Sequence, residues 1–219
     1  MSSDALAEPP ERWARTVAQR ASRAHGRRTL ARLLDSGLAE LTTHGYHGAR
    51  MARIAKRAGT AHGTVYVYFS SKDDLLGAIH AEVDAELQPA MLALPALERG
   101  RPGYDQIRAW MVGVCDVFQR HGAVMQAVAE ALSDEEDSSA GRAALRSLGR
   151  CTSHIAERIR ATGAPGLDPT VAALCIFALI EGANRSVFRG ELLVDRDDLV
   201  TGLAEFVHRS IFGVETQQA

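Results

Sequence analysis

The chain has 219 residues, of which 46% are hydrophobic and 24% are charged, and its formal net charge is −2. This composition is ordinary for a soluble globular protein, and no run reaches the roughly 18 consecutive apolar residues of a membrane span. The cysteines Cys115, Cys151 and Cys175 are too scattered for a disulfide framework or a zinc site, and the N-terminus lacks a secretory signal. We therefore expect a cytoplasmic protein with no membrane contact, metal or other cofactor.

Charge is distributed unevenly along the chain. Residues 11–75 carry twelve basic and five acidic side chains, a balance of +7, whereas the remainder of the chain carries −9. Phosphate contacts supply most of the non-specific affinity of proteins for DNA. A basic end joined to an acidic body is therefore typical of a nucleic-acid-binding head.

The predicted elements of the N-terminal part are all helical. Residues 1–25 are Arg-rich and predict a flexible or partly helical basic arm. The first firm helix has a leucine stripe and ends at His44-Gly45, where glycine acts as a C-terminal cap. Two short helices, at about 50–57 and 61–67, are separated by Ala58-Gly59-Thr60. A longer helix begins at Ser70-Ser71, where Ser71 and Asp74 approximate a capping box, and ends before Pro95.

The remaining residues continue the helical periodicity, and strand patterns are nearly absent. Apolar residues at helical spacing from Ile107 to Phe118 and from Val124 to Leu132 predict the middle helices, and a further helix is expected from about residue 140 to 161. Another begins at Asp168-Pro169, with Asp as N-cap and Pro at the first helical position, and ends at Gly190. A last helix is capped by Asp195 or Asp197. The sequence predicts an all-α fold of nine helices, with a basic arm at 1–25, a DNA-binding domain at 26–70 and an effector-binding and dimerisation domain at 71–219.

The two short helices and their glycine-containing turn predict a helix-turn-helix. Ile54, Ala55, Ala58 and Val65 are expected to face inward, and Phe69 is expected to anchor the end of the second helix. Five residues of the second helix are left to face outward, where they suit contacts with phosphates and base edges. They are His62, Gly63, Thr64, Tyr66 and Val67.

Three linked segments resemble the head of regulators of the tetracycline-repressor (TetR) family. They are Ile54-Ala-Lys-Arg-Ala-Gly59, Gly63-Thr-Val-Tyr-Val-Tyr-Phe69 and Ser71-Lys-Asp-Asp-Leu-Leu76. The resemblance covers about residues 27 to 80 and is specific because the segments occur together. It implies a bacterial transcriptional regulator, usually a repressor, that binds a palindromic operator in double-stranded DNA as a homodimer and responds to a small effector.

The resemblance also implies roles for individual residues. Tyr66, Tyr68 and Lys72 occupy positions that touch phosphates in the family, and the stretch His62, Gly63, Thr64 and Val67 faces the bases. The chain departs from the family pattern at the start of the first short helix, where Ala49-Arg50 replaces a hydroxyl-bearing pair. Another group must cap that helix, and Arg50 becomes a candidate for reaching DNA. Ala61 replaces the serine that usually opens the second helix, which makes Thr60 a candidate cap.

Each of these residues also has a structural interpretation. Tyr66 could pack in the core, but as the neighbour of inward Val65 it should face outward on a helix. Lys72 could be solvated, although a lysine at a helix N-terminus is unfavourable for the helix dipole and favours an anionic partner. His62 is balanced between base contact and solvent.

The apolar run 171–180 predicts a helix that must be covered on every side. One face can pack on its own body, and a second copy of the chain is expected to cover the other together with the last helix. Gly182 and Ala183 permit close approach. The alternative is a wholly internal helix.

The middle helices carry bulky, adaptable side chains that form either plain core or an effector pocket. The apolar candidates are Trp110, Met111, Phe118, Met125 and Phe177. Glu181, Asn184 and Arg185 are polar candidates, and each could instead serve the dimer interface. The resemblance favours a pocket for a small, apolar effector.

Two other functions compete with that of a regulator. An enzyme is disfavoured because the sequence has no nucleophile motif, no His-Glu-x-x-His pair and no phosphate-cradling loop, and because its histidines are isolated. An architectural DNA-binding protein without an effector would have the same head with a filled body and little sequence preference.

Overall fold

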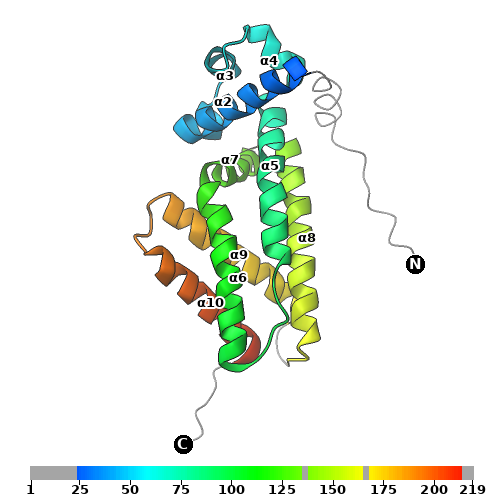
Figure 1. Ribbon diagram of the computed structural model, residues 1–219, viewed down its shortest axis with the longest axis vertical. Coiled ribbons are helices and arrows are strands. Elements are labelled where there is room, and N and C mark those ends of the chain that lie inside the picture. The colour runs from blue at the N-terminus through cyan, green and yellow to red at the C-terminus, as the bar shows by residue number, and fades with distance from the viewer. Residues whose placement is uncertain (1–23, 135–137, 165–167, 214–219) are drawn as a thin grey trace, which may run out of the picture. The chain divides into compact units, whose positions relative to one another are not determined.

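The computed structural model describes residues 24–134, 138–164 and 168–213, and the expected basic arm lies almost wholly outside these ranges. Within them the chain forms nine α-helices and no strand, which confirms the predicted fold class (Figure 1). The chain divides into two compact units. The first contains residues up to Ala81 together with Gln126–Ala143, and the second contains Glu82–Met125 and the residues from Ala144 onward. This division reflects packing alone, so the functional boundary expected at residue 70 stays a prediction.

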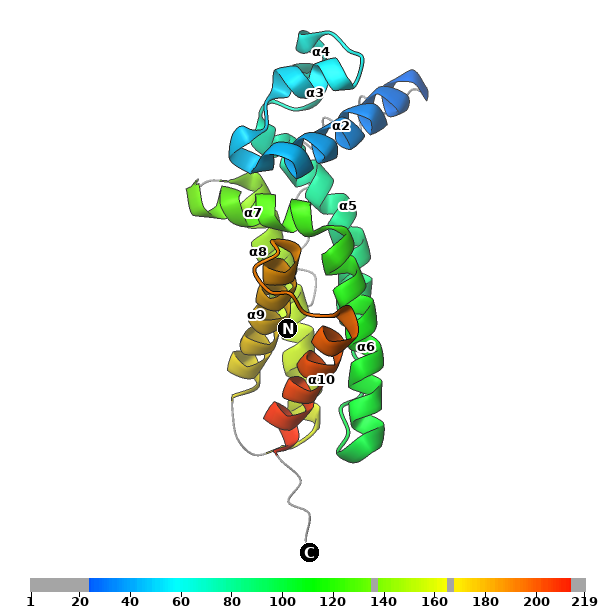
Figure 2. The ribbon, with the colours of Figure 1, turned by 90° about the vertical axis from the view of Figure 1, so that its left-hand side faces the viewer.

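The first unit is built around α2 (Ala24–Gly48), α3 (Met51–Arg57) and α4 (His62–Tyr68), with the first half of α5 (Lys72–Leu92). Helix α3 packs against both α2 and α4, as Figure 2 shows. The predicted stop at Gly45 appears as a kink, because its φ of 65° is left-handed and the helical assignment resumes only for its last few residues. In the leucine stripe of α2, Leu33, Leu34 and Leu41 are buried, Leu30 is half-buried and Leu38 is exposed.

The second unit contains α6 (Gly100–Arg120), most of α8 (Ser139–Ala161), α9 (Pro169–Phe188) and α10 (Arg196–Phe212). Helix α6 lies beside α9 and α10 and supplies a continuous apolar face to the core (Figure 1, Figure 2). Helix α7 (Gly122–Asp134) contributes to both units.

The helix starts in the second unit follow the predicted capping chemistry. The carboxylate of Asp168 accepts hydrogen bonds from the backbone N–H groups of Thr170 and Val171, and Pro169 occupies the first turn of α9. Asp195, rather than Asp197, caps α10 by accepting from the N–H of Asp197. Short polar side chains thus satisfy donors that a helix start leaves free.

Helix α9 is long and apolar enough to cross a membrane by length and composition. Its residues Ala173, Ile176 and Ile180 nevertheless pack into the core of the second unit. The opposite side exposes apolar groups, so the prediction of a helix that its own body covers on only one face is confirmed for this protomer.

Candidate nucleic-acid interface

The inner side of the helix-turn-helix packs as predicted. Ile54, Ala55, Ala58 and Val65 are buried, as is Phe69 at the end of α4. The turn between α3 and α4 places Gly59 at a φ of 63°, a left-handed conformation that other residues rarely adopt. The small side chains on α3 let α4 cross closely, which fixes the direction in which α4 presents its other face.

A buried carboxylate organises the start of α3. Glu40 of α2 is 4% exposed, and its Oε1 atom accepts hydrogen bonds from the backbone N–H of Arg50 at 3.2 Å and from Nε of Arg53 at 2.5 Å. Arg53 also donates to the carbonyl of Gly48. Glu40 therefore binds the N-cap residue of α3 from another helix and ties α2 to α3, whereas no N-cap side chain accepts from the first turn of α3, contrary to the expected cap.

This role of Glu40 was not predictable from the sequence. The only signal was an isolated acid in an Arg-rich segment, and nothing in the spacing showed which arginine it would meet. The pairing also occupies Arg53, whereas the side chain of Arg50 at the N-cap of α3 is exposed.

The outer side of α4 presents the predicted residues to solvent. His62, Gly63 and Val67 are exposed, Thr64 is half-buried, and Tyr66 is 48% exposed. The rings of His62 and Tyr66 meet edge to face, with centroids 5.3 Å apart. The outward placement of Tyr66 is confirmed, and a contact between this face and DNA stays a prediction.

Tyr68 differs from Tyr66. It is only 8% exposed, and its hydroxyl donates to the carbonyl of Gly26 on α2 at 3.4 Å. This placement gives Tyr68 a role in joining α4 to α2, and it does not support the expected phosphate contact. The motif predicts two aromatic residues in α4, but the helical phase turns only one of them outward.

Lys72 lies at the first position of α5 and is held in place by Tyr46. Its Nζ atom donates to the carbonyl of Tyr46 at 2.6 Å and lies 3.9 Å from the centroid of the Tyr46 ring. Tyr46 is in turn fixed by its backbone N–H, which donates to Glu130 of α7 at 2.8 Å. An ammonium group has three donors, so Lys72 can keep this bond and still meet a phosphate. The role of Tyr46 was not found from the sequence.

The caps around α4 and α5 correct one expectation and confirm another. Thr60 does not cap α4, because its hydroxyl donates to the carbonyl of Ala55 instead, and the N-cap residue Ala61 has no side-chain acceptor. Ser71 does cap α5, since its hydroxyl accepts from the N–H of Asp74 at 3.0 Å. The carboxylate of Asp74 accepts from the N–H of Ser70 in return, so the chain forms a capping box shifted by one residue.

A surface hollow of about 400 Å³ lies between α3 and α4. It is lined by Lys56, Thr60 and His62 together with two alanines of α3. Its polar lining adds hydrogen-bond donors next to the exposed face of α4.

The expected effector residues lie in the second unit. Trp110, Met111 and Phe118 belong to its buried core, and Met125 and Phe177 pack against that core. The indole of Trp110 donates to the carbonyl of Ala90 at 2.9 Å, and the ring centroids of Phe118 and Phe177 are 6.4 Å apart. These contacts fit a packed core, and binding of an effector among these side chains stays a prediction.

The polar residues of this region are partly satisfied. The amide nitrogen of buried Asn184 donates to the carbonyl of Ile180 at 2.8 Å, while its oxygen has no hydrogen-bond partner among the described residues. Glu181 pairs with Arg185 at 2.7 Å, and burial raises the pKa of the Glu181 carboxyl despite that pairing. Within the described ranges, no group of three His, Cys, Asp or Glu side chains is placed to hold a metal ion.

The fold and this surface define a class of protein. A helix-turn-helix with an exposed second helix, flanked by cationic side chains and joined to a larger helical body, is the architecture of a DNA-binding transcriptional regulator. Residues 33–79 match the model of the bacterial regulatory proteins of the tetR family. The matched segment spans α3 and α4 with parts of α2 and α5, so the N-terminal part of this chain is similar to that family.

Curated relatives match part of the chain. The fatty acid metabolism regulator protein of Bacillus subtilis is 38% identical over 50 residues, which cover 23% of this chain and 26% of that protein. The HTH-type transcriptional regulator BetI of Escherichia coli is 34% identical over 96 residues, which cover 43% of this chain and 49% of BetI. The match therefore spans half or less of each relative's length.

Solved structures resemble the whole fold. A TetR-like transcriptional regulator from Rhodococcus sp. RHA1 has a TM-score of 0.64 at 20% identity, covering 83% of this chain and 94% of that one. The regulator FadR from Bacillus subtilis, solved with stearoyl-CoA, has a TM-score of 0.63 at 18% identity, covering 84% and 99%. At these identities the likeness shows the shared fold alone.

Proposed function

We propose that the protein binds an inverted-repeat operator as a homodimer in the cytoplasm, represses transcription there, and is released by a small, apolar effector. The observation that carries the proposal is the outer face of α4. Its polar and aromatic residues are exposed, while Glu40, Tyr46 and Tyr68 fix the helices behind it. A rigidly mounted, exposed second helix is what reading the major groove requires.

The residues proposed to contact DNA form two groups, one for phosphates and one for base edges. Tyr66 and Lys72 contact phosphates and position the head. His62, Gly63, Thr64, Val67 and Arg50 face base edges. The excess of twelve basic over five acidic residues in 11–75 supplies attraction that does not depend on sequence.

The dimer is proposed to form through α9 and α10. Val171 and Leu174 on α9 and Phe206 on α10 are each more than half exposed, and Leu193 in the loop between these helices is 97% exposed. Exposed apolar surface on this scale is typical of an interface rather than of a monomer. A second copy related by a twofold axis would cover the same face on both protomers.

The effector is proposed to enter among Trp110, Phe118, Met125 and Phe177, with Met111, Glu181 and Asn184 nearby. The unpartnered amide oxygen of Asn184 offers an acceptor to a ligand that carries a hydrogen-bond donor. Because the FadR neighbour was solved with stearoyl-CoA, long-chain acyl thioesters of CoA are the first compounds to test. Effector and operator must weaken each other's binding by the same factor.

Selection of bound sequences from random double-stranded DNA tests this function. We expect an inverted repeat whose half-sites lie about one helical turn, or a small multiple of it, apart. An asymmetric selected site would overturn the dimeric mode of binding.

A second candidate function is that of an architectural DNA-binding protein without an effector, and the packed core around Met111 favours it. It predicts little sequence preference and no compound that shifts the melting temperature. A thermal-shift screen with acyl-CoA thioesters, run beside the selection, separates the two functions.

A further inference from the structure

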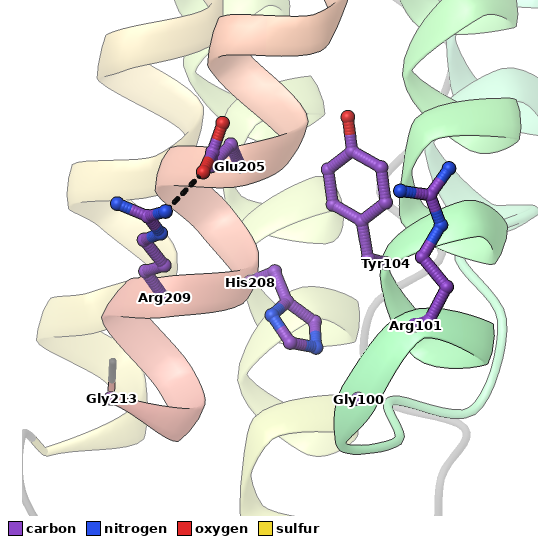
Figure 3. A pocket seen from close by; sticks show the side chains of 7 residues that line it. All are labelled: Gly100, Arg101, Tyr104, Glu205, His208, Arg209 and Gly213. Atoms are coloured by element: carbon purple, nitrogen blue, oxygen red, sulfur yellow. Dashed lines mark ion pairs between the residues drawn. The ribbon is translucent and has the colours of Figure 1, made fainter. Parts of the chain in front are cut away.

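A second hollow lies in the larger unit, away from the residues proposed for the effector. It has a volume of about 350 Å³ and lies between the start of α6 and the end of α10. Five side chains and two glycines line it (Figure 3). They are Gly100, Arg101, Tyr104, Glu205, His208, Arg209 and Gly213.

The imidazole of His208 is the group in this hollow that lacks a partner. The residue is only 9% exposed, and its Nε2 atom has no hydrogen-bond partner among the residues that the structure describes. Figure 3 shows the ring directed from α10 toward α6. The ring packs against aromatic groups, with its centroid 6.3 Å from that of Tyr104 and 5.2 Å from that of Phe212. Aromatic contacts hold the ring but do not satisfy a buried ring nitrogen.

The first turn of α6 adds hydrogen-bond donors on the other side. Its N-cap residue Arg99 makes no side-chain capping bond, and the turn contains no acidic residue. The Arg99 guanidinium instead donates to the carbonyl of Phe212 at 3.1 Å. The start of a 21-residue helix carries a partial positive charge, which favours an anion, and the N–H groups of Gly100 and Arg101 precede Pro102, which has no N–H of its own.

The charges around the hollow indicate which anion fits. Arg101 and Arg209 are cationic and Glu205 is anionic, so these three side chains together carry one net positive charge. Glu205 is paired with Arg209, and Arg101 is paired with Asp105 at 3.0 Å. Among the described residues of the lining, the one carboxylate is thus already paired, while the imidazole and the helix start offer donors. A singly charged head is favoured over a dianion, which Glu205 would repel.

We propose that this hollow is a binding site for a small organic carboxylate. The carboxylate accepts a hydrogen bond from Nε2 of His208 and lies at the start of α6, and the body of the ligand packs against the Tyr104 ring. The guanidinium of Arg101, 5.1 Å from the centroid of that ring, borders the site and adds long-range attraction. Benzoate combines a single negative charge with a flat apolar body of a size that fits the volume, and it serves as the probe.

The test is an NMR titration of the full-length protein with benzoate at millimolar concentrations. We expect saturable binding that His208→Leu weakens by about ten- to a hundred-fold, the value of one hydrogen bond to a charged group. His154→Leu is the matched control, because the Nε2 atom of His154 on α8 is also buried without a partner but lies outside the hollow. It should bind benzoate like the wild type.

Three other measurements complete the test. The Arg101 side chain is 79% exposed, so Arg101→Ala should not affect folding. It should weaken benzoate binding several-fold, and it carries the test if His208→Leu does not fold. Neutral benzyl alcohol should bind much more weakly than benzoate. The proposal is overturned if benzoate does not bind, if inorganic phosphate binds more tightly than benzoate, or if the His154 and His208 variants lose benzoate equally.

Discussion

The outer face of α4 and the apolar face of α9 are both exposed, but they differ in how they are supported. The face of α4 is mostly polar and aromatic, and hydrogen bonds from Arg53 to Glu40 and from Lys72 to the Tyr46 carbonyl fix the elements behind it. The face of α9 is apolar and stands on a close-packed core, where the buried Asn184 amide donates to Sγ of Cys115 on α6 at a long 3.5 Å. Reading DNA requires fixed directions, which hydrogen bonds provide, whereas pairing two protomers requires area, which apolar side chains provide.

The largest effect should come from placing a charge on the face of α9. In Leu174→Arg the new guanidinium would be buried without a partner in the dimer, at a cost of about 3–5 kcal/mol. Leu174 is 51% exposed in the protomer, so the fold of each chain should survive. We expect a folded monomer by sedimentation and circular dichroism, with loss of operator binding.

Leu145→Arg is the matched control for this substitution. Leu145 on α8 is 53% exposed but lies on neither α9 nor α10. The Leu145 variant should remain dimeric and bind the operator. If Leu174→Arg is also dimeric, or if the wild type is monomeric at micromolar concentration, α9 is not the interface.

The next effect concerns the support behind α4. Glu40→Gln removes the charge that accepts from Arg53 and from the N–H of Arg50. Because the Arg53 side chain is 41% exposed, water compensates part of the loss, and we expect the free energy of unfolding to fall by about 1–2 kcal/mol. Operator affinity should fall as well, because the start of α3 loosens.

Urea denaturation of Glu40→Gln and Asp35→Asn measures this effect. Asp35 lies on the exposed side of α2, so its substitution should leave stability nearly unchanged. Equal stability of the two variants would show that Glu40 does not hold the head together.

The two regions also differ in what their sequences could reveal. The helices and the inward positions of α3 and α4 were predictable, because helical periodicity and a glycine turn act over a few neighbouring residues. The partners of Glu40 and Lys72 were not, because those contacts depend on how α2, α3 and α5 pack. Leu38 continued a leucine stripe in sequence yet is exposed, since the stripe is wider than the face that α2 buries.

The sequence was equally insufficient to predict a ligand site in the second unit. Residues such as Met111 and Phe118 were recognisable as large and apolar, but a filled core and a ligand site use the same residues. The hollow beside His208 was not predicted, because Arg101 and Arg209 are far apart in sequence and His208 appeared isolated. Only the packing of α6 against α10 brings them together.

A smaller effect distinguishes positioning from reading in the head. Lys72→Ala removes a charge proposed to meet a phosphate, and phosphates look alike in every sequence. The substitution should weaken binding to operator and to random DNA by similar factors. It should also lower the slope of log affinity against log salt concentration by about one unit per dimer arm. Lys72→Arg keeps the charge and should restore most of the affinity.

Competition titrations against operator and scrambled duplexes at two salt concentrations measure this. Unfolding should be followed in parallel, because Lys72 also bonds to the Tyr46 carbonyl. A change in the preferred bases would mean that Lys72 reads sequence rather than positioning the head.

The smallest effect compares the two tyrosines of α4, which share one helix but lie in opposite environments. Tyr66→Phe removes an exposed hydroxyl and keeps the ring against His62, so operator affinity should fall by about 1 kcal/mol with little change in sequence preference. Tyr68→Phe removes a hydroxyl that donates to Gly26 inside the head, so it should lower stability slightly and leave DNA affinity unchanged. Operator titrations and urea denaturation of both variants separate the two losses. If Tyr68→Phe loses DNA affinity while Tyr66→Phe keeps it, the phosphate contact belongs to the buried tyrosine, and α4 must reorient when it binds DNA.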